Sequence, residues 1–216
     1  MGTIADHGAL MRLSLPAGEK LSLRRGAFIA STHEMDFAAM RDAKGAKSWM
    51  RLFAGGSVSR IVWSCEADCE VTASLDFIGT TLSIPVGDGT PVSIAPKLFL
   101  GYLGTVSQAL GRGAKKEFWV MSKLSGAGSV FLHVPGGYTV MEVDGSVVVD
   151  TDRVAATIGD LEAVGTMRGA KDILKSGEMD AVRMEGTGRI VLAHNSLGSV
   201  ENEAAGWLSL IPGMDV

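Results

Sequence analysis

Long apolar runs are missing from this sequence. No run reaches the roughly 18 residues that a membrane-spanning helix requires. The first residues, MGTIADHGALM, lack the basic start and apolar stretch of a secretory signal. Asp6 stands where a myristoylation signal needs Ser or Thr. We therefore expect a cytoplasmic protein with no transmembrane segment.

Cysteine is also scarce, with Cys65 and Cys69 as the two in the chain. On one strand these two side chains would share a face and lie roughly 13 Å apart, too far for a disulfide. A zinc site needs two more ligands, and no second closely spaced pair supplies them. We expect two half-buried thiols and no metal.

Basic residues are outnumbered, 20 against 24 acidic, which gives a net charge of -4. Such a chain has no general attraction to nucleic acid or anionic lipid. Its basic pairs are Arg24-Arg25 and Lys115-Lys116, the second near Arg112 and the aromatic pair Phe118-Trp119. One such cluster is less than a nucleic-acid surface needs, and solvated turns explain both pairs.

Charged residues are 20% of the chain, whereas hydrophobic residues are 46%. This apolar surplus favours burial between subunits. Trp and Met are enriched at protein interfaces, yet Trp63 and Trp119 each lie in an apolar run, which favours the core.

Proline is rare at six residues, but glycine is abundant at 28, and both mark an internal repeat. Three segments read apolar-x-apolar-Pro-x-Gly and then return into an alternating run: LSLPAGEKLSL at 13–23, LSIPVGDGTPVSI at 82–94 and LHVPGGYTVMEV at 132–143. Alternation with period two predicts strands with one buried face. Each segment is therefore expected to form a hairpin or a strand corner.

An apolar pair ending on a small residue follows each copy, at 28–30, 99–101 and 154–156. The small residue would allow another backbone to approach closely. We predict one domain over residues 1–216, made of three diverged copies near 8–60, 61–115 and 116–216. The fold class is an all-β sandwich.

A second element recurs as KLSGAGSVFLH at 123–133 and RMEGTGRIVLAH at 183–194. Asp144-Gly145 is expected to form a two-residue hairpin turn. Residues 103–116 and 160–175 are expected to be irregular surface connections. Residues 33–44 stay open between strand and helix, because Ser31 and Glu34 could form a capping box.

Three longer stretches carry a family resemblance: 13–31, 128–156 and 175–194. They resemble the mitochondrial-biogenesis family named for altered inheritance of mitochondria. The resemblance implies a fold like the tryptophan RNA-binding attenuator protein, with one β unit repeated three times in a chain and the chains often in a homotrimer. The family resembled has no established catalytic residues and no agreed ligand, so the resemblance assigns no site residue.

The chemical candidates are few. Both Gly126-x-Gly128 and Gly186-x-Gly188 lead into strands, so a bulge or tight strand crossing is favoured over a phosphate loop. The histidines are His7, His33, His133 and His194. His133 and His194 occupy nearly matching positions, which suggests a shared surface, but duplication alone would give the same match.

No catalytic constellation emerges. No Gly-x-Ser-x-Gly occurs, and Glu142 with Asp144 or Asp150 with Asp152 fall at predicted turns or strand ends. A metal site built from the histidines with Glu34, Asp36 or Glu185 is not indicated, because no His-x-His or His-x-x-x-His spacing occurs.

We expect a non-catalytic structural or scaffolding module without a cofactor, self-assembling as a trimer and open to a protein partner. The alternative is a small-molecule binder with its site between repeats or subunits.

Overall fold

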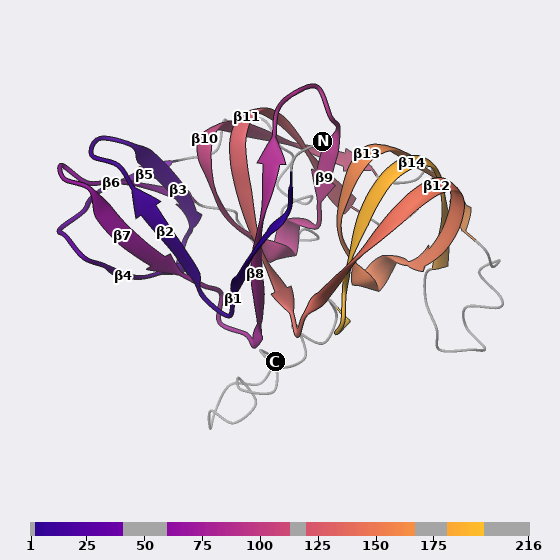
Figure 1. The fold of residues 1–216 in the computed structure, drawn as a ribbon, viewed down its shortest axis with the longest axis horizontal. Helices are drawn as coiled ribbons and strands as arrows, with labels where there is room; N and C mark the ends of the chain where they lie inside the picture. The colour runs from indigo at the N-terminus through magenta and orange to yellow at the C-terminus, as the bar shows by residue number, and fades with distance from the viewer. Residues whose placement is uncertain (1–2, 41–59, 113–119, 167–180, 197–216) are drawn as a thin grey trace, which may run out of the picture.

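The computed structural model describes residues 3–40, 60–112, 120–166 and 181–196. Most of these residues lie in strands, which confirms the all-β class (Figure 1). The strands are β1 (Ala5–Gly8), β2 (Met11–Leu15), β3 (Lys20–Arg24), β4 (Phe28–Ser31), β5 (Asp36–Met40), β6 (Arg60–Ser64), β7 (Cys69–Ala73), β8 (Gly79–Val86), β9 (Val92–Ile94), β10 (Phe99–Arg112), β11 (Val120–Pro135), β12 (Tyr138–Asp150), β13 (Val154–Thr166) and β14 (Ala181–Ala193). Two three-residue 3-10 helices, η1 (Pro96–Leu98) and η2 (Thr151–Arg153), complete the described chain. No helix among the described residues is long and apolar enough to cross a membrane.

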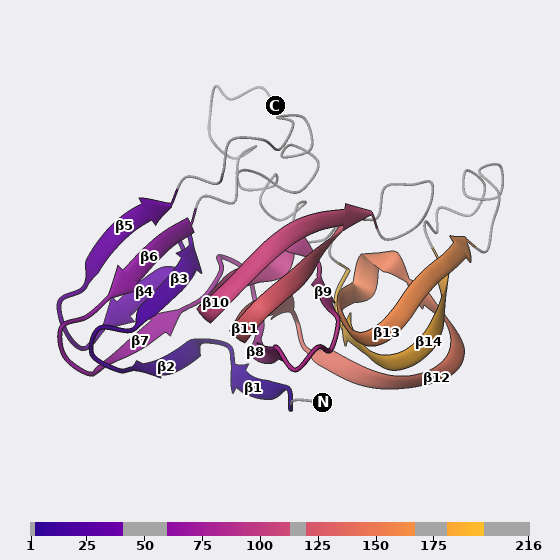
Figure 2. The same ribbon diagram turned by 90° about the horizontal axis from the view of Figure 1, so that it is seen from above.

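Three lobes lie side by side in Figures 1 and 2: an N-terminal lobe of β2–β7, a central lobe of β1 and β8–β11, and a C-terminal lobe of β12–β14. One antiparallel sheet runs through all of them in the order β12-β14-β13-β9-β11-β10-β3-β6-β5, with β8 added on β11 and β1 on β8. A second, three-stranded sheet, β2-β7-β4, completes the N-terminal lobe. Strand β6 pairs with β3, and β7 pairs with β2. Residues 60–73 therefore belong to the same lobe as the chain before residue 41. The repeat boundaries themselves stay a prediction.

The three Pro-x-Gly segments are all strand corners. The strands that they join are β2 with β3, β8 with β9, and β11 with β12, and in no case do the two strands pair with each other. β2 pairs with β7, for example, whereas β3 pairs with β6 and β10. Strand β2 ends just before Pro16, β8 ends one residue after Pro85, and β11 ends at Pro135. A glycine at positive φ follows each of these strands (77° at Gly18, 140° at Gly87, 72° at Gly136) and turns the chain into a new pairing. The three segments are therefore corners between strands and not hairpins.

A β-bulge occurs at the start of one strand in each lobe. The register shifts at Ile29 in β4, at Leu100 in β10 and at Ala155 in β13. Just after the second bulge, a Cβ on Gly101 would come within 2.4 Å of the Ser22 carbonyl oxygen. The expectation that a small residue permits close backbone approach is confirmed at Gly101.

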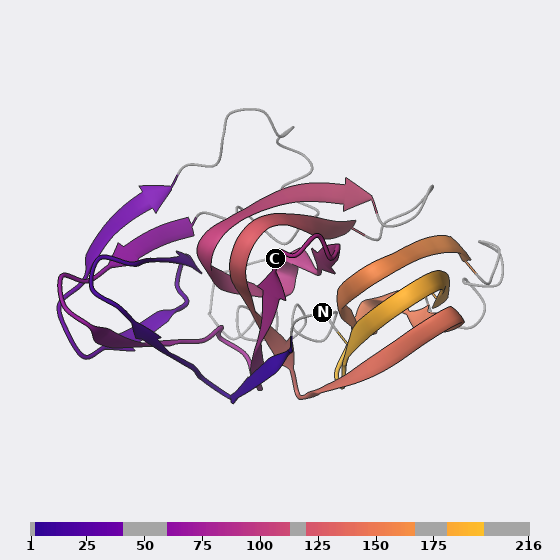
Figure 3. The ribbon, with the colours of Figure 1, turned by 45° about the horizontal axis from the view of Figure 1, so that its top comes forward.

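The glycine pairs of the second element also lie where strands come close. A Cβ on Gly126 would stand 1.8 Å from the Thr105 carbonyl oxygen, and one on Gly186 would stand 2.0 Å from that of Asp160. Both glycines have positive φ, 103° and 128°. The long strands of the central and C-terminal lobes are strongly curved, as Figure 3 shows. We attribute the curvature to these glycines.

Three expectations about local structure were wrong or are now resolved. Asp144-Gly145 is not a turn, because β12 continues through it and pairs it with Thr187 and Gly186. Gly145, with φ of 111°, bends a strand whose partner continues alongside. Residues 103–112 and 160–166 are strand and not irregular, and within 33–44 the described residues 36–40 form β5.

Two apolar cores hold the lobes together. One includes Leu82, Phe99 and Ile190 and fills the central and C-terminal lobes. The other lies between the two sheets of the N-terminal lobe, yet it includes Leu100 and Phe131 from the central strands. The N-terminal and central lobes therefore share a core. Trp63 is half-buried against this second core and stacks on Phe28 at a ring distance of 4.3 Å.

Candidate functional site

His133 is the most deeply buried titratable side chain among those that the sequence singles out. It lies in β11 with 1% of its surface exposed. Its Nδ1 is 2.9 Å from the Thr81 hydroxyl, and its Nε2 is 2.9 Å from the Phe77 carbonyl oxygen. Since a carbonyl can only accept, Nε2 carries the proton and Nδ1 accepts from Thr81. Burial lowers the pKa of His133, with a smaller opposing effect from the bond to Phe77. The neutral ring thus fastens β8 and the segment before it to β11.

His133 and His194 do not form a shared surface. Leu132 pairs with Phe99 and Leu192 with Val154, the first residue of each bulged strand. His133 therefore matches Ala193, one residue before His194. A shift of one residue reverses the face that a strand side chain occupies. His194 is exposed, with Nε2 3.0 Å from the Thr139 hydroxyl.

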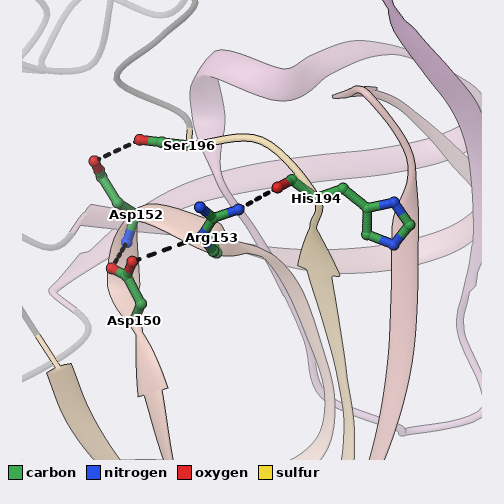
Figure 4. A network of polar contacts seen from close by, with 5 residues as sticks. All are labelled: Asp150, Asp152, Arg153, His194 and Ser196. Atoms are coloured by element: carbon green, nitrogen blue, oxygen red, sulfur yellow. Dashed lines mark hydrogen bonds and ion pairs between the residues drawn. The ribbon is translucent and has the colours of Figure 1, made fainter.

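A polar network surrounds η2 at the end of the C-terminal lobe (Figure 4). The Asp150 carboxylate accepts from the Asp152 N–H at 3.0 Å and lies 3.8 Å from Arg153 Nε. Arg153 Nη1 donates to the His194 carbonyl, and Ser196 Oγ donates to Asp152 at 2.9 Å. Asp150 therefore caps the 3-10 turn, and Asp152 and Arg153 hold the residues that follow β14 against it. Both carboxylates are exposed to water, and their contacts are structural.

The other predicted site residues lie apart. His7 Nε2 is 3.1 Å from the Ser83 hydroxyl, and the exposed His33 contacts Thr32. In β12, Asp144 accepts from the Thr187 hydroxyl at 3.3 Å. Within the described ranges no three His, Cys, Asp or Glu side chains gather in a group that could hold a metal ion.

The two thiols meet across a chain turn, so the expectation of two distant side chains on one strand was wrong. Cys65 follows β6 and Cys69 begins β7, and these strands belong to different sheets. Both are free and buried, not half-buried. Burial, and then a hydrogen bond between the two thiols, raise the pKa of Cys69 to about 11. A thiol with so high a pKa is a poor nucleophile at neutral pH.

Arg24 of the first basic pair also has a structural place. Its Nη1 donates to the Lys97 carbonyl at 2.8 Å, which ties the N-terminal lobe to the central lobe. Burial lowers the pKa of Arg24, against the opposing charge of Asp76. A solvated turn therefore accounts for the exposed Arg25 and not for Arg24. The cluster of Lys115, Lys116, Phe118 and Trp119 lies outside the described residues.

A shallow depression lies between the central and C-terminal lobes. Its volume is about 160 Å³, and it is lined by the β8–β9 corner, with Asp88 and Thr90, and by Ile158 and Arg189 across from it. The hydroxyl and N–H of Thr90 lower the pKa of Asp88. Pockets for drug-sized ligands measure roughly 300–1,000 Å³. This depression could accommodate only an ion or a very small molecule.

Comparison with known proteins shows the fold and the family. The structure is similar to the X-ray crystal structure of a structural-genomics target protein from Streptococcus pyogenes, with a TM-score of 0.72 and 15% sequence identity. The match covers 95% of this chain and 100% of that one. No curated protein matches the sequence significantly. The family model described as mitochondrial biogenesis AIM24 matches residues 3–194, and the chain therefore belongs to that family.

Proposed function

We propose that this chain is a non-catalytic structural module of the cytoplasm that assembles with copies of itself into a trimer. The observation that carries the proposal is the large sheet, which passes from lobe to lobe and then ends on a long edge strand. β12 has 13 residues and, among the described strands, pairs with β14 alone. It exposes Val140 and Val148, the latter at 45%.

Such an edge is a template for another chain, because its unpaired N–H and C=O groups remain available. Proteins that stay monomeric usually shorten or cover such an edge, or place lysines on it. β12 has no lysine. The 46% hydrophobic content of the chain supports the same proposal, since burial between subunits would use the surplus.

Sedimentation equilibrium of the full chain at micromolar concentration tests the proposal. A species with the mass of three chains is the expected result. A single-chain mass throughout the concentration range would contradict self-assembly.

The depression at the β8–β9 corner supports a second candidate function, the binding of a small anion or metabolite between lobes. A thermal-shift screen of inorganic anions and of very small metabolites such as amino acids tests it. A ligand present at 100 times its Kd would stabilise the fold by about 2.7 kcal/mol. No shift across the screen would contradict this second function and leave the first standing.

A further inference from the structure

The three lobes share one register, which the pairing of their strands defines. Leu23, Ile94 and Val149 each lie five residues before the first residue of a bulged strand, which is Phe28, Phe99 or Val154. The same three residues pair with Ile61, Ser122 and Val182 on their inner neighbours. Residues 21–23, 92–94 and 147–149 are therefore equivalent. In the third copy the equivalent segment lies deeper in β12 than the repeat motif at 132–143 indicates.

Each junction between lobes follows the same rule. The second strand of one corner pairs with the bulged strand of the next lobe. Leu23 lies opposite Gly101, and Ser22 lies opposite Tyr102. In the same way Ile94 lies opposite Ala156, and Ser93 opposite Thr157.

One second strand of a corner, in β12, and one bulged strand, β4, have no partner of this kind among the described strands. Residues 147–149 of β12 have β14 on one side, and β4 has β7 on one side, with no strand on the other side among those described. In Figure 1, β4 and β12 lie in the two outer lobes, with the central lobe between them, so they do not meet within one chain.

The bulge residues differ in exposure between the two junctions and the unpaired edge of β4. Leu100 and Ala155 are fully buried in the two junctions, with 0% exposed. Their equivalent in β4, Ile29, is 52% exposed. On the other edge, Val148 is 45% exposed, whereas its equivalent Ser22 is 2% exposed. Both apolar side chains therefore lie exposed where an inter-lobe junction would cover them.

We propose that the same junction forms a third time, between chains: β12 of one copy pairs antiparallel with β4 of the next, Val149 opposite Ala30 and Val148 opposite Ser31. This inference rests on the proposed self-assembly and names its interface. The contact joins two different surfaces, so it must close into a ring or run on as a filament. With three chains it closes a ring of nine lobes.

A charge placed on the exposed bulge tests the interface. Ile29→Arg is expected to abolish the trimer at concentrations where the parent chain is fully trimeric, because each chain contributes a β4 edge to the ring. Ile29 is half exposed, so the lobe itself should fold, which circular dichroism would verify. The matched control is Phe37→Arg, an apolar residue of β5 that is 70% exposed and lies outside the proposed junction. That variant should stay trimeric.

A pair of cysteines tests the register. Ser31→Cys with Val148→Cys places two thiols directly opposite across the proposed pair, within the Cα separation of roughly 4.4–6.8 Å that a disulfide needs. Oxidation should give covalent dimers and trimers on a denaturing gel. The control pairs Ser31→Cys with Glu142→Cys, six residues away on β12, and should stay uncrosslinked.

The outcomes separate the two proposals. A parent chain that sediments as a monomer overturns the proposed function. A trimeric parent whose Ile29→Arg variant is still trimeric, or whose opposed cysteines fail to crosslink, overturns this interface and leaves self-assembly intact.

Discussion

Replacing Thr81 by valine removes the hydroxyl that donates to Nδ1 of the buried His133. Thr81 has 0% of its surface exposed, so water cannot take over that bond without opening the fold. A buried acceptor left unpaired costs about 1–3 kcal/mol. In a chain of this size each kcal/mol shifts the melting temperature by about 2–4 °C. Thermal unfolding followed by circular dichroism should therefore show a fall of about 2–12 °C.

The effect of Thr81→Val on stability should change sign in a His133→Phe background. In a His133→Phe variant Nδ1 no longer exists, and it is the Thr81 hydroxyl that is left unpaired. Adding Thr81→Val to that variant should be neutral or stabilising. Thr105→Val is the exposed control and should stay within about 0.5 kcal/mol of the parent chain. An equal cost of Thr81→Val in both backgrounds would refute the assigned hydrogen bond.

Three further predictions follow from the glycines, the buried imidazole and the thiols. Gly145→Ala should lower the free energy of unfolding by about 1–3 kcal/mol because of its positive φ alone. Gly126→Ala adds a clash with a strand carbonyl and should lower it by about 1–3 kcal/mol more. Equal urea midpoints for the two variants would contradict this. Because folding lowers the pKa of His133, the unfolded chain binds its proton first, so stability should fall as pH drops below about 6.5, and His133→Phe should flatten that fall. Cys65 and Cys69 should react with a disulfide reagent at neutral pH only after urea unfolding; rapid labelling of the native protein would show that they are accessible.

The repeats could be predicted from sequence because they depend on local chemistry. Proline is disfavoured inside a ladder and glycine accepts positive φ, so Pro16 and Gly18 indicate a corner before any partner strand is known. What the corner pairs with is a long-range property. The choice between hairpin and corner therefore had to come from the fold.

At Asp144-Gly145, by contrast, the local sequence preference gives the wrong prediction. The dipeptide is typical of a tight turn, but its partner strand β14 runs alongside without a break, from Ala181 to Ala193. Thirteen cross-strand pairs outweigh the preference of two residues. The same reasoning explains the long strands where irregular connections were expected.

Whether His133 and His194 share a surface depends on the register between the two related elements, in which the sequence places them at nearly matching positions. Aligning His133 with His194 is natural when both follow an apolar run, yet strand pairing matches His133 with Ala193. With a period of two, that single residue separates a buried imidazole from an exposed one. The bulges at Ile29, Leu100 and Ala155 do have a sequence signal, the recurring apolar pair before a small residue. That these positions form bulges became visible only through the pairing of the strands.

Native mass spectrometry of the purified full-length chain tests the central claim most directly, because it reports stoichiometry and any retained small molecule together. The account predicts one species with three times the mass of a single chain and no added mass. A single-chain species would contradict assembly through the sheet edges. A reproducible added mass per chain would contradict the purely structural role and favour a ligand between lobes.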